Sequence, residues 1–112
     1  MAWKIEFYDE IVEASIKKWP EDMVPKFLWI LNLIEKVGPD KIDTPSIKTL
    51  GNGLFKINAK SHKDIGCALF CVSAEDNTVI ILDGFTKITP KKMLDRIMLA
   101  QNRMHEIHLK EI

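Results

Sequence analysis

Side chains that can contact phosphate or move a proton gather in one short stretch of this chain. Lys56, Asn58 and Lys60 alternate along the extended run LFKINAK at 54–60, and His62 follows two residues after its end. Because side chains on a strand alternate between its two faces, the first three lie on the same face. Ammonium groups there could bind phosphate oxygens, and an imidazole can act as an acid or base near neutral pH. The common alternative is that such lysines and a turn histidine are simply solvated.

The spacing of the two cysteines, Cys67 and Cys71, argues against redox or metal chemistry. On one strand they would face the same way but lie roughly 13 Å apart at ~3.3 Å per residue. A disulfide needs Cα atoms within ~7 Å, and one zinc ion could not reach both thiolates. We therefore expect two small buried or half-buried thiols. His105 and His108 could form a metal-binding pair on a helix, but no third ligand is evident, so we expect no metal or other cofactor.

Charge is distributed unevenly along a chain whose formal net charge is zero. Residues 1–40 carry five Lys and eight Asp or Glu, a net of −3, whereas residues 41–112 carry eleven basic and eight acidic side chains, a net of +3. A polyanion site is therefore expected in the second half. The overall neutrality weighs against strong nucleic-acid binding, because phosphate neutralisation supplies much of that affinity.

Length and composition predict a single globular domain spanning residues 1–112. The chain is 46% hydrophobic and 29% charged, which is an ordinary balance for a folded domain with its own core. No apolar run reaches the ~18 residues of a membrane span. The first ten residues turn acidic, unlike a secretory signal peptide, so we expect a cytoplasmic protein.

The first forty residues predict a strand followed by two helices. Alternating apolar and charged residues indicate a strand at 3–8, and Asp9 can cap a short helix that runs to about Lys18. A second helix should run from about 21 to 37, with acidic residues in its first turn and Gly38 at its end. Residues at helical spacing form its apolar stripe: Met23, Phe27, Ile30, Leu31, Ile34 and Val37.

Trp29 and Leu33 form a second apolar edge on this helix, away from the main stripe. We expect the first helix to cover them. The alternative is a surface for a protein partner, because large exposed apolar patches are often binding sites.

The remaining residues predict strands and a final helix. After a loop with a short extended piece at Ser46–Leu50, strands are expected at 54–60, 66–74 and 78–86. Thr89, with a proline directly after it, is a strong start signal for the last helix. That helix has an apolar stripe at Met93, Ile97, Ala100, Met104 and Ile107. The order predicts an α+β fold.

This second half resembles a known family in both order and sequence. The segment LGNGLFKINAK is followed by GCALFCVSA, then TVIILDGF, and then the helix that Thr89-Pro90 opens. The order resembles the closing half of the RelE/ParE toxin superfamily, in particular its phage-derived HigB-like branch, whose consensus is roughly LGxGLxELRxK, IxRxxYxxxx and IxLLHGFxKKTxKTPxxEIxxAxxR. The resemblance implies the RelE-like order β-α-α-β-β-β-α, in which a helical hairpin packs on a small, mainly antiparallel sheet and a C-terminal helix closes one side.

The resemblance also implies a site on the open face of the sheet. Toxins of this family cut RNA through attack of the 2′-hydroxyl on the adjacent phosphate, with Lys, Arg, His or Tyr side chains and no metal. Lys60 falls on the lysine that ends ELRxK, and Lys87 falls near the lysines after GF. The expected catalytic residues are Lys60, Lys87 and His62, and the expected RNA-binding residues are Lys56, Asn58, Lys63, Lys91 and Lys92.

Several family positions that carry chemistry differ in this chain. Asn58 stands in place of the arginine of ELR, Cys67 replaces a second arginine on the next strand, and Asp83 replaces the histidine of LHGF. Neither asparagine nor cysteine can reproduce the charged, bidentate fork of a guanidinium group.

The resemblance therefore predicts the toxin of a type II toxin–antitoxin pair, an mRNA endoribonuclease that acts at the ribosome. Its expected partners are mRNA on the ribosome and a small antitoxin of helix-turn-helix type, with no membrane contact. Two alternatives stay open: a catalytically silent RelE-like domain that binds RNA or a partner, and a ParE-like poison of a DNA topoisomerase. The missing arginines and the neutral charge favour the silent domain.

Overall fold

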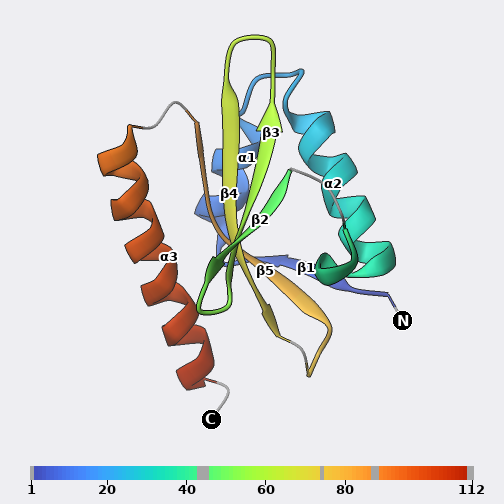
Figure 1. Cartoon of the computed structure of the whole chain (residues 1–112), viewed down its shortest axis with the longest axis vertical. Coiled ribbons are helices and arrows are strands. Elements are labelled where there is room, and N and C mark those ends of the chain that lie inside the picture. Colours follow the sequence, from blue (N-terminus) through green and yellow to red (C-terminus); the bar gives the residue numbers. More distant parts are fainter. Residues whose placement is uncertain (1, 43–45, 74, 87–88, 111–112) are drawn as a thin grey trace.

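A computed structural model describes residues 2–42, 46–73, 75–86 and 89–110, which form five strands and three α-helices (Figure 1). In chain order the elements are β1 (Lys4–Phe7), α1 (Glu10–Lys17), α2 (Val24–Val37), a short 3-10 helix η1 (Pro39–Lys41), β2 (Ile47–Gly51), β3 (Leu54–Lys60), β4 (Ile65–Ser73), β5 (Thr78–Thr86) and α3 (Pro90–Lys110). The predicted α+β class and element order are confirmed. The extended piece expected near Ser46–Leu50 is a full strand, β2, which pairs with β3.

The five strands form one mixed sheet in the order β1-β5-β4-β3-β2. β1 runs parallel to β5, and the other neighbouring pairs are antiparallel. The central strands β4 and β5 are buried along most of their length, as their apolar sequences predict. Within the described ranges, no helix is long and apolar enough to cross a membrane.

Helices α1 and α2 cover one face of the sheet with an apolar core. Trp19 and Phe27 meet edge to face, with ring centroids 5.3 Å apart. Gly84 on β5 allows α1 to approach closely, since a Cβ at this position would lie 2.4 Å from Cγ1 of Ile16. The helices and the turn between them supply buried residues that include Val12, Ile16, Met23, Phe27, Ile30 and Ile34. The sheet supplies Ile57, Ala59, Ala68, Phe70, Val79 and Ile81.

Helix α3 packs on the opposite face of the sheet, on the far side from α2 in Figure 1. Its predicted stripe is confirmed, with Ala100 buried and the other four residues partly buried against the sheet. Thr89 caps the helix as predicted, because its Oγ1 accepts a hydrogen bond from the Lys92 amide at 3.3 Å. Cys67 and Cys71 are both buried on this face, as expected.

At the ends of the first two helices, the predicted cap at Asp9 and the predicted end at Gly38 are confirmed, and two other predictions are wrong. The Asp9 carboxylate accepts the Val12 amide at 2.9 Å, and Gly38 ends α2 with φ of 83°. Glu21 and Asp22 do not lie in the first turn of α2, because a separate turn precedes the helix start at Val24. Val37 is exposed, since the next buried position of the helix falls on Gly38, against which Trp3 packs.

Candidate functional site

The polar face predicted on β3 exists and lies on the α3 side of the sheet. Leu54, on the same face of β3 as Lys56, Asn58 and Lys60, is buried in the α3 core. The strand register carries this face across the sheet. One row runs Lys56–Leu69–Asp83, and the next runs Asn58–Cys67–Phe85. The start of α3 therefore faces these β3 side chains across β4.

A cleft of about 490 Å³ opens over this face, between β3 and the first turn of α3. Three lysines and one carboxylate give its rim a positive balance, and its floor is apolar. The residues that line it are Lys56, Asn58, Lys60, Lys63, Asp64, Ile65, Cys67, Phe85 and Met93. Such a cationic cleft with an apolar floor suits a phosphate-bearing ligand with flat bases.

The structure brings together only some of the predicted site residues. Lys56, Asn58, Lys60 and Lys63 line the cleft, whereas His62 is exposed at the tip of the β3–β4 hairpin and does not. The His62 amide donates to the Asp22 carboxylate at 3.0 Å, which ties this tip to the turn before α2.

The predicted lysines near α3 have different outcomes. Lys91 and Lys92 are exposed in the first turn of the helix but do not line the cleft. Lys87 lies outside the described residues, so its predicted role stays a prediction.

Cys67 sits on the floor of the cleft as a neutral thiol. Burial raises its pKa to about 12, partly opposed by the positive charge of Lys56 and reinforced by the negative charge of Asp83. At neutral pH the group is therefore neither a nucleophile nor a base. In the strand register Cys67 lies between Asn58 and Phe85, one row from Lys56 and Asp83.

Sequence reasoning missed a charged cluster beside the cleft, formed by Asp83 and two arginines of α3. The Asp83 side chain is 6% exposed, and its two oxygens lie 3.4 Å from Nη1 of Arg96. Nη1 of Arg103 lies 4.0 Å away on the other side. Burial raises the pKa of Asp83, opposed by Arg96, by the Gly84 amide and by Arg103. A carboxylate within an apolar strand could have signalled such partners, because buried charges are almost always paired.

The two arginines differ in their surroundings. Arg103 is largely buried, donates to the Leu82 carbonyl and lies 4.7 Å above the Tyr8 ring. The Tyr8 hydroxyl in turn donates to Glu106 at 2.6 Å, which is the main reason why its pKa is raised. Arg96 is more open, with a side chain 44% exposed and its guanidinium 5.8 Å from the centroid of Phe85. Arg103 thus anchors α3, whereas Arg96 borders the cleft.

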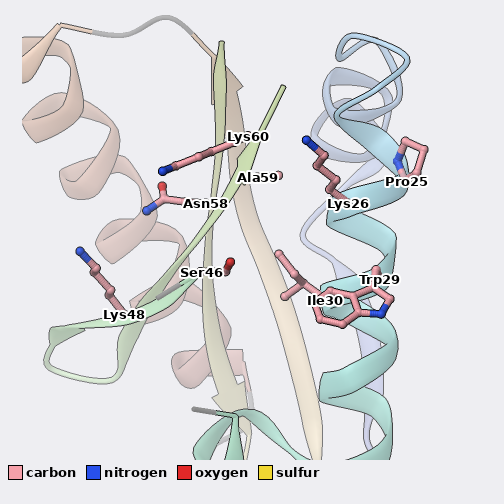
Figure 2. A pocket seen from close by; sticks show the side chains of 9 residues that line it. All are labelled: Pro25, Lys26, Trp29, Ile30, Ser46, Lys48, Asn58, Ala59 and Lys60. Carbon is pink, nitrogen blue, oxygen red and sulfur yellow. The ribbon is translucent and has the colours of Figure 1, made fainter. Parts of the chain in front are cut away.

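A second cavity, of about 650 Å³, lies between α2 and the end of β3 (Figure 2). Its lining residues are Pro25, Lys26, Trp29, Ile30, Ser46, Lys48, Asn58, Ala59 and Lys60. In Figure 2, Ala59 points towards α2, whereas the polar ends of Asn58 and Lys60 point away from it. The last residue of β3 that pairs with β2 is Ile57, and one further hydrogen bond joins the Asn58 amide to the Ser46 carbonyl. The cavity lies beyond this point, at the edge of the sheet, and we call it the edge groove.

The expectation that α1 covers Trp29 is wrong, because Trp29 is 60% exposed at the edge groove. Helix α1 packs over β5 and α2 over β3, so the outer side of α2 is left open. Leu33 is half-buried and does not line the groove. Across the described ranges there is also no group of three or more His, Cys, Asp or Glu residues arranged to hold a metal ion.

Comparison with known proteins places this geometry in context. The family described as phage-derived protein Gp49-like (DUF891) matches residues 14–105. No curated protein matches the chain by sequence. Solved structures of RelE toxins share its fold, which confirms the predicted RelE-like architecture.

Three of these structures illustrate the likeness, each at 16% identity. The isolated E. coli RelE toxin has a TM-score of 0.58 and covers 86% of this chain and 99% of its own. RelE in the intact E. coli RelBE toxin–antitoxin complex has a TM-score of 0.58 and covers 79% of this chain and 100% of its own. The matched chain of the archaeal RelE–RelB complex from Pyrococcus horikoshii OT3 has a TM-score of 0.56 and covers 75% of this chain and 93% of its own. At these identities the likeness concerns the fold.

Proposed function

We propose that this chain, which belongs to the phage-derived Gp49-like family, is the toxin of a type II toxin–antitoxin pair and cleaves mRNA at the ribosome. The observation that carries the proposal is the lysine-lined cleft over β3, on the same fold as RelE toxins. Lys56, Lys60 and Lys63 contribute positive charge from one side of a concave surface. Phosphate neutralisation by such groups supplies much of the affinity for RNA.

In this proposal the protein contributes charge and position, and it needs no metal. Lys60 and Lys56 stabilise the phosphate as negative charge builds up on it in the transition state. Asn58, between them on the same face, can donate and accept hydrogen bonds with the ribose or a base. Lys87 and His62 remain proposed as further catalytic groups, and Lys91 and Lys92 as contacts to RNA beyond the cleft.

The ribosome is the proposed place of action because the cleft has weaker electrostatics than the family pattern. Loss of one phosphate-stabilising donor typically costs ~10²–10³ in rate. Here Asn58 and Cys67 occupy two arginine positions of the family, and Cys67 stays neutral at physiological pH. Firm positioning of the mRNA on the ribosome can offset such a loss, because orientation alone can lower a barrier by several kcal/mol, ~7–11 at best.

The test compares Lys56→Ala/Lys60→Ala with the wild type for mRNA cleavage in a translating extract and for growth inhibition. We expect at least a ~10²-fold loss of cleavage, as for other transition-state donors, with little change in melting temperature. The matched control is Lys18→Ala/Lys36→Ala, which removes the same charge from exposed positions on the α1–α2 side. Cleavage that survives in a folded cleft variant would refute the site. RNA binding without any cleavage by the wild type would instead establish the silent domain, which the neutral Cys67 favours.

We also propose that an antitoxin binds at the edge groove. Three lysines border it, Lys26, Lys48 and Lys60, and among the residues that the structure describes no carboxylate lines it. The exposed indole of Trp29 and the apolar wall at Ala59 add surface for apolar side chains. An antitoxin segment that combines acidic and apolar residues would match this lining. The solved RelE–RelB complexes support a partner of this kind, since RelE is bound to RelB in them.

A further inference from the structure

Arg96 is the one half-exposed guanidinium near the cleft among the described residues, and nothing above assigns it a ligand. It lies on α3 one turn after Met93, which lines the cleft, and its guanidinium is 5.8 Å from the ring centroid of Phe85, another lining residue. Arg96 does not itself line the cleft, but it lies beside two residues that do, at the α3 side. Lys56 lies on the opposite wall, on β3, which is two strands from β5, or roughly 10 Å between these strands at ~4.8 Å per strand.

The contact between Arg96 and Asp83 leaves most of the guanidinium available. Both hydrogen bonds, each of 3.4 Å, start from the same nitrogen, Nη1. Hydrogen bonds of this length are weak, since N–H···O bonds are usually 2.7–3.2 Å. Nη2 and Nε have no hydrogen-bond partner within the ranges that the structure describes. A phosphate offers the bidentate geometry that the Asp83 contact does not reach.

Asp83 does not prevent an anion from approaching this position. Its side chain is 6% exposed, and Arg103 lies 4.0 Å from it as a second cationic neighbour. Arg103 is itself anchored to the Leu82 carbonyl and the Tyr8 ring, so the buried carboxylate keeps one fixed cationic neighbour. Arg96 can thus turn towards a ligand without leaving a buried charge uncompensated.

We propose that Arg96 forms a phosphate-binding subsite at the α3 wall of the cleft, opposite Lys56, which holds a backbone phosphate of the bound RNA. The subsite rests on the proposed function. It would supply an arginine to the cleft, whereas the sheet has Asn58 and Cys67 at the two positions where the family pattern has arginine. The arginine comes from a different element, the helix α3, and reaches the same cleft across β5.

The test measures binding of a single-stranded 2′-O-methyl oligoribonucleotide, which cannot be cleaved, by fluorescence anisotropy at several salt concentrations. Arg96→Gln should weaken binding about tenfold, as expected for one charge-assisted contact. It should also lower the slope of log K against log salt by about 0.7, the value for one phosphate contact with a single strand. Arg96→Lys should restore the salt slope but only part of the affinity, because it keeps the charge and loses the fork. Lys18→Gln, an equal charge change at the C-cap of α1, is the control.

A second pair of variants separates phosphate binding from an effect through Asp83. The Asp83→Asn variant lacks the buried carboxylate. If Arg96 acted only by pairing with that carboxylate, Arg96→Gln would not change RNA binding in this background. We expect Arg96→Gln to weaken RNA binding as much in this background as in the wild type. The inference is overturned if Arg96→Gln has no effect in the Asp83→Asn background.

The failure of this inference can be told apart from the failure of the proposed function. If Lys56→Ala/Lys60→Ala abolishes RNA binding and Arg96→Gln leaves it unchanged, the cleft stands and the Arg96 subsite is wrong. If the wild type does not bind the oligonucleotide at all, the Arg96 subsite is wrong, and the proposed function is decided separately by mRNA cleavage in the translating extract. Thermal unfolding of each variant shows that the comparison is made between folded proteins.

Discussion

The two faces of the sheet differ in what packs on them. Towards α1 and α2, the contact is apolar and closed, and inward residues such as Phe27 and Ile34 are at most 1% exposed. Towards α3, the helix is only half-buried apart from Ala100, and the face includes the buried Asp83 with two arginines. The polar cleft lies at the start of α3, on this second face.

This difference separates the residues that stabilise the fold from those available for chemistry. A closed apolar layer on one face supplies most of the burial that a small domain needs. The other face can then keep lysines and a guanidinium partly solvated, because its helix covers the sheet incompletely. Helix α3 is held there by the Asp83–Arg103 anchor and one apolar stripe. The candidate site thus lies where packing is thinner and side chains can move.

The largest expected effect is the loss of a core side chain on the closed face. Phe27→Ala should destabilise the protein by about 3–5 kcal/mol, because it leaves a cavity against Trp19 and the sheet. Met93→Ala, on the half-buried α3 stripe, should cost clearly less, and the two can be compared by urea unfolding. Equal losses at both positions would show that the faces do not differ in this way.

Local signals predicted the elements of this fold well. Asp9 and Thr89 cap their helices, and Gly38 ends α2, because each effect depends on residues within a few positions along the chain. The alternation along β3 placed Lys56, Asn58 and Lys60 on one face for the same reason. These parts of the candidate site could be found without tertiary information.

The rest depended on packing between distant segments. In the charged cluster, Asp83 on β5 contacts Arg96 and Arg103 on α3, which lie 13 and 20 positions further along the chain. No local sequence pattern specifies these contacts. The exposure of Trp29 depends on where α1 lies, and α1 packs over β5 rather than beside Trp29. Likewise, the prominence of His62 in the sequence did not indicate that it lies outside the cleft.

A smaller effect should appear in the pH dependence of stability, through Asp83. Because burial raises its pKa above the ordinary 3.8, the folded protein holds a proton that the unfolded chain has already released. Unfolding then releases this proton, so stability contributed by Asp83 falls as pH rises from about 3.8 through the raised pKa. The free energy of unfolding of wild type minus that of Asp83→Asn should therefore decrease with rising pH in this window.

Chemical denaturation at a series of pH values measures this difference. Asp95→Asn provides a control, because Asp95 is exposed on α3 and carries the same side chain. A difference that increases with pH over the same window would mean that the two arginines outweigh burial at Asp83, contrary to the direction inferred here.

The smallest effect on stability is expected at Trp29, where the edge groove leaves the ring 60% exposed. Trp29→Ala should change the free energy of unfolding by no more than about 0.5 kcal/mol, as for ordinary surface positions. It should nevertheless weaken the proposed antitoxin contact, because exposed tryptophans that become buried are frequent hot spots and cost about 2 kcal/mol or more when removed. The measurement is retention of the product of the neighbouring reading frame, as the candidate antitoxin, in a co-purification, together with thermal unfolding of the free chain. Leu28→Ala is the matched control, since Leu28 is an exposed apolar residue of α2 outside the groove. If Trp29→Ala lowers stability sharply while antitoxin retention is unchanged, Trp29 supports the fold, and the closed face extends further around α2 than its exposure indicates.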